Sequence, residues 1–104
     1  MSERIEKIKA FLVGNPTDSF LQHALALEFL KLGDEKEARR LFEKLLEENE
    51  QYVGSYYHLG KLLESSGENE NAIACFEKGM QMAKQAGDQH SFNELKSAYD
   101  DLIY

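Results

Sequence analysis

The sequence contains an internal repeat. When residues 19–52 are aligned without gaps on residues 53–86, seven positions are identical. Four of them are a leucine, a glycine, an alanine and a phenylalanine, which in the first copy are Leu25, Gly33, Ala38 and Phe42. A period of about 34 residues is typical of a helix–turn–helix unit that stacks on copies of itself. The chain is therefore predicted to be a stack of helical units.

The local pattern favours helices throughout. Apolar residues recur at intervals of three and four, and no sustained alternation of the strand type is present. A glycine followed by an acidic residue occurs at Gly33, Gly67 and Gly87, and this pair is typical of one helix ending and the next beginning. Asp34 and Glu37 are spaced as a capping box. The pattern predicts six helices, over residues 3–16, 18–32, 35–49, 53–66, 69–86 and 88–103.

Charge and composition restrict the partners of this chain. Nineteen acidic and twelve basic residues give a formal charge of −7, which repels nucleic-acid phosphates and anionic lipid surfaces. No segment approaches the ~20 apolar residues of a membrane span, and the charged N-terminal stretch differs from a secretory signal. Cys75 alone forms no internal disulfide and no zinc-binding pair, and is expected to be a partly buried filler. We expect a cytoplasmic protein with no nucleic-acid partner and no membrane insertion.

The repeated residues resemble the tetratricopeptide-repeat family, whose unit reads W-x2-L-G-x2-Y, then A-x3-F, then P. Residues 53–86 carry this pattern as Tyr56-x2-Leu59-Gly60-x2-Leu63 followed by Ala72-x3-Phe76. Residues 19–52 are similar, with Gln22-x2-Leu25-Ala26-x2-Phe29 followed by Ala38-x3-Phe42. The terminal proline of the pattern is matched by Pro16 alone. The chain also resembles the small stand-alone repeat proteins of bacteria.

The resemblance implies an all-α fold, a short right-handed superhelix of about two full repeats with flanking N- and C-terminal helices. It also implies that the chain is a single domain over residues 1–104. Within that domain we expect a truncated leading helix, two repeats and a capping helix, at residues 1–18, 19–52, 53–86 and 87–104.

In this family the first helix of each repeat lines a concave groove that holds an extended peptide or a partner helix. The resemblance therefore implies a non-catalytic protein-interaction module that needs no cofactor. Tyr57 is expected to face the groove because it follows Tyr56, which takes the core position. Phe20 and Leu27 either face the groove or are covered by the first helix. The expected groove residues are Phe20, His23, Leu27, Tyr57, His58 and Lys61.

Two alternatives remain open at this stage. An exposed apolar groove on so short a chain is also suited to a second copy, which would give a homodimer through the groove or an end helix. His23, His58 and His90 fall near the start of three successive first helices and suggest a metal site. A repeat spacing of about 10 Å is too wide for shared coordination, however, so this function is less favoured. No motif for a catalytic nucleophile or a phosphate-binding loop is present, so no catalytic residue is expected.

Overall fold

The computed structural model describes residues 2–104, and within that range its regular structure is entirely helical. The prediction of an all-α fold is confirmed, and each predicted helix boundary lies within two residues of the observed one. The helices are α1 (Glu3–Gly14), α2 (Ser19–Lys31), α3 (Glu35–Glu48), α4 (Gly54–Ser65), α5 (Asn69–Ala86) and α6 (Gln89–Ile103).

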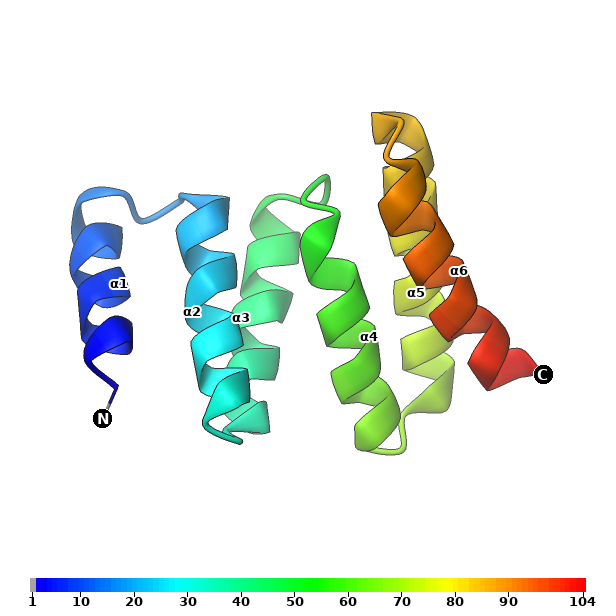
Figure 1. Cartoon of the computed structure of the whole chain (residues 1–104), viewed down its shortest axis with the longest axis horizontal. Helices are drawn as coiled ribbons and strands as arrows, with labels where there is room; N and C mark the ends of the chain where they lie inside the picture. Colours follow the sequence, from blue (N-terminus) through cyan, green and yellow to red (C-terminus); the bar gives the residue numbers. More distant parts are fainter. Residues whose placement is uncertain (1) are drawn as a thin grey trace. The chain divides into compact units, whose positions relative to one another are not determined.

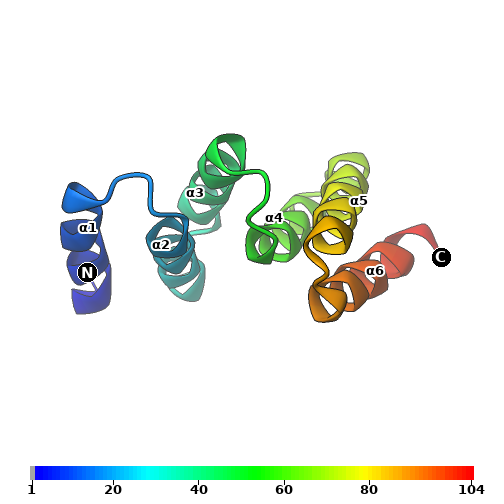
Figure 2. The same cartoon turned by 90° about the horizontal axis from the view of Figure 1, so that it is seen from above.

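The chain divides into two compact units, the first ending at Asn49 and the second running from Glu50 to Tyr104. Helices α1 to α3 form the first unit, and α4 to α6 form the second. Within each unit, consecutive helices run antiparallel and lie side by side (Figures 1 and 2). All five tyrosines of the sequence lie in the second unit. That residues 1–104 form a single domain stays a prediction.

The turn glycines end their helices as the sequence predicts. Gly33 and Gly67, which are equivalent in the two repeats, both have a φ of 80°. This left-handed conformation is strained for residues with a side chain, and it is the usual way to satisfy the last carbonyl groups of a helix. The amide of the following residue donates back in each case, from Asp34 to the carbonyl of Phe29 and from Glu68 to that of Leu63. The two turns are therefore closed by the same hydrogen bond.

The capping box expected at Asp34 is only half formed. Its carboxylate accepts a hydrogen bond from the backbone amide of Glu37 at 3.1 Å, which caps α3. The Glu37 carboxylate does not complete the box, because it accepts two hydrogen bonds from Arg40, at 2.7 and 2.8 Å. Glu68, at the equivalent place before α5, makes no side-chain cap, and its carboxylate accepts from Ser66 and Asn71 instead.

Helix α1 is held on α2 by apolar burial and by charge. Ile5 and Ile8 are buried. The largely buried carboxylate of Glu28 on α2 lies 3.2 Å from Arg4 Nε and 3.1 Å from Lys31 Nζ, so its charge is balanced by two exposed cations. Ala38 and Phe42, the repeated small and large residues, are fully buried, which allows α3 to lie close to α2.

The second unit is built around a close approach of α4, α5 and α6. Tyr56 is buried on α4, and its hydroxyl donates to the carbonyl oxygen of Glu50 at 2.6 Å. A Cβ at Gly79 on α5 would lie 2.6 Å from Tyr56 Cβ and 3.0 Å from Leu95 Cδ1, so only glycine fits between α4 and α6 at this point. Cys75 is half-buried, as expected for a filler.

Candidate functional site

The second unit presents Tyr57, His58 and Lys61 on one side of α4, and we call these three residues the α4 surface. Tyr56 points inward and is 4% exposed, whereas the next residue, Tyr57, is only half-buried. The rings of Tyr57 and His58 lie 5.6 Å apart at 85°. Lys61 follows Tyr57 by one helical turn. Tyr56 therefore takes the predicted core position, whereas the prediction that Tyr57 faces a groove stays a prediction.

Lys61 is not a free cation in this surface. Its Nζ lies 3.1 Å from Glu64 Oε1, which forms an ion pair across one turn of α4. That oxygen is shielded from solvent and accepts no hydrogen bond among residues 2–104, so its charge is balanced by the nearby charge of Lys61. Because the Lys61 side chain is still 44% exposed, a ligand can approach it from the solvent side.

His58 is electrostatically linked to α6. Burial lowers the pKa of its imidazole below the ordinary value near 6.5, and the carboxylate of Glu94 on α6 acts in the opposite direction. Burial has the larger effect, so the neutral ring is favoured at neutral pH. Glu94 was not predicted from the sequence, because α6 departs from the repeat pattern and no register placed this residue near α4.

In the first unit, Phe20, His23 and Leu27 on α2 form what we call the α2 surface. Phe20 is 68% exposed and is therefore not covered by α1, whereas Leu27 is half-buried. The ring of His23 lies 5.6 Å from that of Phe42 at 62°, so one side of His23 faces the interior of the unit. Phe20 is therefore the most accessible apolar member of this surface.

The six predicted groove residues thus fall into two sets, one in each unit. The α2 surface and the α4 surface each lie on the first helix of a repeated unit. That they line one groove stays a prediction.

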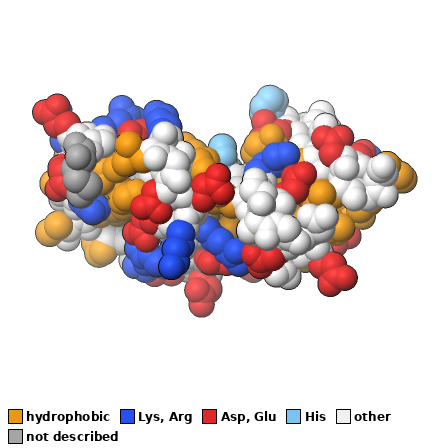
Figure 3. Space-filling model, turned by 90° about the horizontal axis from the view of Figure 1, so that it is seen from below, with side chains coloured by type: hydrophobic (Ala, Val, Ile, Leu, Met, Phe, Trp, Pro, Cys, Tyr) orange, Lys and Arg blue, Asp and Glu red, His pale blue; other side chains and the backbone are white. Residues whose placement is uncertain are grey.

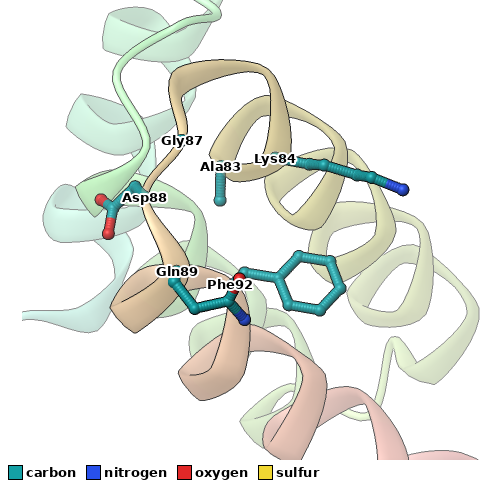
Figure 4. Close-up of a pocket in the computed structure, with 6 residues that line it drawn as sticks. All are labelled: Ala83, Lys84, Gly87, Asp88, Gln89 and Phe92. Atoms are coloured by element: carbon teal, nitrogen blue, oxygen red, sulfur yellow. The ribbon is translucent and has the colours of Figure 1, made fainter.

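A pocket of about 320 Å³, which was not predicted from the sequence, lies where α5 turns into α6. Figure 4 shows the ring of Phe92 below Ala83, with the side chain of Lys84 extending away from them. Asp88 is committed to capping α6, since its two carboxylate oxygens accept from the amide and the hydroxyl of Ser91 at 3.0 and 2.7 Å. The lining residues are Ala83, Lys84, Gly87, Asp88, Gln89 and Phe92.

Helix α3 presents a charged outer face. Arg39 Nε lies 3.3 Å from Glu43 Oε2, and Arg40 Nε lies 2.7 Å from Glu37 Oε1. Acidic and basic side chains are likewise interspersed with hydrophobic ones on the side of the molecule shown in Figure 3. The pairing of opposite charges along α3 is typical of a helix face in contact with water.

The histidines do not come together as a metal site. Across residues 2–104, no group of three or more His, Cys, Asp and Glu side chains is arranged to hold a metal ion. His23 belongs to the first unit, and His58 and His90 belong to the second. None of the described helices combines the length and the apolar content needed to cross a membrane.

Comparison with known protein families identifies the chain. The family model of the tetratricopeptide repeat matches residues 21–52 and 53–85, which is more than half of the sequence. The chain therefore belongs to the tetratricopeptide-repeat family. The fold of this family generally serves protein–protein interaction. The comparison with curated proteins gave no match.

Solved structures show the same fold in small bacterial proteins. The solution structure of a tetratricopeptide repeat domain protein from Salinibacter ruber is 40% identical, covers 85% of this chain and 89% of that one, and has a TM-score of 0.80. A crystal structure of the Salinibacter ruber domain is also 40% identical, covers 82% of this chain and 96% of that one, and has a TM-score of 0.80. A protein from Bordetella parapertussis is 24% identical over 98% of this chain and 89% of its own, with a TM-score of 0.81, and shows the fold alone.

Proposed function

We propose that this chain is a non-catalytic protein-binding module that acts in the cytoplasm and contacts its partner through the α2 surface and the α4 surface. The partner segment is an extended peptide or an amphipathic helix, which presents apolar side chains to both surfaces. No cofactor takes part.

The observation that carries this proposal is the exposure of large apolar side chains on the first helix of a repeat. Phe20 is 68% exposed, although burial of a phenylalanine is strongly favourable. Tyr57 combines an apolar ring with a hydroxyl, and residues of this kind commonly anchor interfaces. Lys61 lies one turn from Tyr57 and adds a charge at the edge of the same surface.

Site-specific crosslinking tests the proposal. A photoreactive phenylalanine analogue is placed at Tyr57, and in a matched variant at Glu47, which is exposed on α3. We expect the probe at position 57 to crosslink a partner in the native cell, and the probe at position 47 to give none. Crosslinks from position 47 alone would show that the partner uses the outer face of α3, and would contradict the proposal.

Self-association, as a homodimer through the groove residues or an end helix, is the second candidate. The first unit exposes Phe11, Val13 and Phe20, which are apolar residues that a second copy would cover. Light scattering over a range of concentrations separates the two candidates. A homodimer that persists on dilution and is lost in Phe20→Ser would assign the surface to self-association, whereas a monomer would leave it to another protein.

A further inference from the structure

The two repeats differ at one buried position. Gln22 and Tyr56 take the same place in the repeat alignment. The Tyr56 hydroxyl donates to the carbonyl oxygen of Glu50 at 2.6 Å, and the Gln22 amide donates to the carbonyl oxygen of Pro16 at 2.9 Å. Pro16 and Glu50 are equivalent when the same alignment is extended toward the N-terminus. The same hydrogen bond is therefore made in both units, by an aromatic side chain in the second and by a shorter amide in the first.

A cavity of about 230 Å³, lined in part by Gln22, lies among α1, α2 and α3. An apolar cavity of about 150 Å³ is already large enough to bind benzene, so this cavity has room for an aromatic ring. Pro16 and Lys44 are exposed, and the cavity is therefore open to solvent on that side. Its lining consists of Leu12, Pro16, Gln22, Leu25, Leu41 and Lys44.

A second difference concerns charge at the rim. Lys44 and Lys78 are again equivalent in the two repeats. Lys78 Nζ lies 3.3 Å from Glu50 Oε2 in the second unit. In the first unit a proline, Pro16, stands where Glu50 would be, and no acidic group among residues 2–104 pairs with Lys44. The second unit thus has a ring and a lysine-paired carboxylate, Tyr56 and Glu50, at the places where the first unit has Gln22 and Pro16.

We propose that this cavity is a binding site for an aromatic side chain flanked by an acidic residue, presented by a protein partner. The ring lies against Leu12, Leu25 and Leu41, and the acid pairs with Lys44. Gln22 keeps its hydrogen bonds to Pro16 and to Glu48, so its amide needs no hydrogen-bond partner from the ligand. The site uses neither the α2 surface nor the α4 surface and does not rest on the function proposed for them.

Nuclear magnetic resonance titration of the full chain tests the site with three probes. These are the peptide acetyl-Glu-Tyr-Glu-amide, its neutral counterpart acetyl-Gln-Tyr-Gln-amide, and the small acid 3-(4-hydroxyphenyl)propionate. We expect the acidic peptide to shift the methyl signals of Leu12, Leu25 and Leu41. The neutral peptide should bind roughly two- to fivefold more weakly, as expected for the loss of one exposed ion pair. Lys44→Gln should remove this difference.

Filling the cavity from within gives the decisive variant. Gln22→Tyr introduces the aromatic residue that the second unit has at this place and should abolish the shifts, whereas Gln81→Tyr adds the same side chain at an exposed position and should leave them unchanged. If Gln22→Tyr does not give a helical circular-dichroism spectrum, Leu41→Phe fills the cavity from α3 with the same expected result. Retained binding in the cavity-filled variant, or no shift with any probe, would overturn the site. Binding of the small acid without the peptide would overturn its assignment to a protein partner.

Discussion

The ring of Phe76 on α5 occupies the place that a side chain at Gly60 on α4 would need. A Cβ built at residue 60 meets the atoms of this ring, and Phe76 is fully buried. The glycine of the Leu-Gly pair and the phenylalanine of the A-x3-F segment therefore pack against each other. Helices α4 and α5 approach each other closely because one residue has no side chain and the other fills the space.

Gly60→Ala is expected to destabilise the protein, although alanine is the better helix former. Overpacking costs about 1–3 kcal/mol, against a gain in helix propensity of up to about 1 kcal/mol. The melting temperature should fall by several degrees, measured by circular dichroism. Gly14→Ala is the control, because a Cβ at Gly14 meets nothing within 4 Å. Equal melting temperatures for the two variants would show that the Gly60–Phe76 contact adapts without cost.

Ala72→Leu tests the repeat register itself. Ala72 is fully buried where α5 lies against α4, so a larger side chain should cost about 1–3 kcal/mol or more in the free energy of unfolding. Urea unfolding measures this difference. Glu47→Leu is the matched control, since Glu47 is exposed and should be nearly silent. Glu48 is less suitable, because its carboxylate accepts a hydrogen bond from Gln22 at 3.1 Å. An unchanged stability of Ala72→Leu would contradict the register.

Partner binding through the α4 surface should depend on Tyr57 more than on Lys61. Removing an aromatic anchor costs on the order of 2 kcal/mol, and removing an exposed charge less than about 1 kcal/mol. Calorimetry with the partner identified by crosslinking should therefore show weaker binding for Tyr57→Ala than for Lys61→Ala. Both variants should retain the helical circular-dichroism signal. Full affinity in both variants, together with loss of binding in Glu47→Lys, would instead place the partner on α3.

The stability of the protein should decrease as the pH falls below about 6.5, in part through His58. Burial lowers the pKa of His58 in the folded state, so the unfolded chain takes up a proton first. The contribution of His58 is complete above pH 6.5 and is lost as the pH falls through the lower folded-state pKa. Urea unfolding at pH 7.5 and 5.5 should show a smaller loss for His58→Gln than for the wild type. The exposed His90→Gln serves as control, and an equal loss in all three proteins would rule out this role of His58.

Helix positions were predictable because backbone geometry is encoded locally. The Gly-acidic pairs locate three of the turns, and every predicted helix end lies within two residues of the observed one. Side-chain partners were less predictable, since they depend on competition between neighbours. Glu37 has the spacing of a capping box, yet the charged hydrogen bonds from Arg40 compete successfully for its carboxylate.

The candidate surfaces were predictable to the extent that adjacent residues on a helix face different ways. The burial of Tyr56 and the partial exposure of Tyr57 follow from this rule. The exposure of Phe20 does not, because it depends on where α1 lies, and neither does the influence of Glu94 on His58, which needs the packing of α6 on α4. The cavity beside Gln22 was hidden as well, since a pattern match records which residue is present and not the volume it leaves.

The intrinsic fluorophores of the molecule are confined to one of its two units. The sequence has no tryptophan, and its five tyrosines all belong to the second unit. Tyrosine fluorescence therefore reports on residues 50–104, whereas far-ultraviolet dichroism reports on the helices of both units. Coincidence of the two signals during unfolding is a test of all-or-none behaviour. Without any added label, the chain thus allows one to measure whether its halves unfold as one cooperative body or in succession.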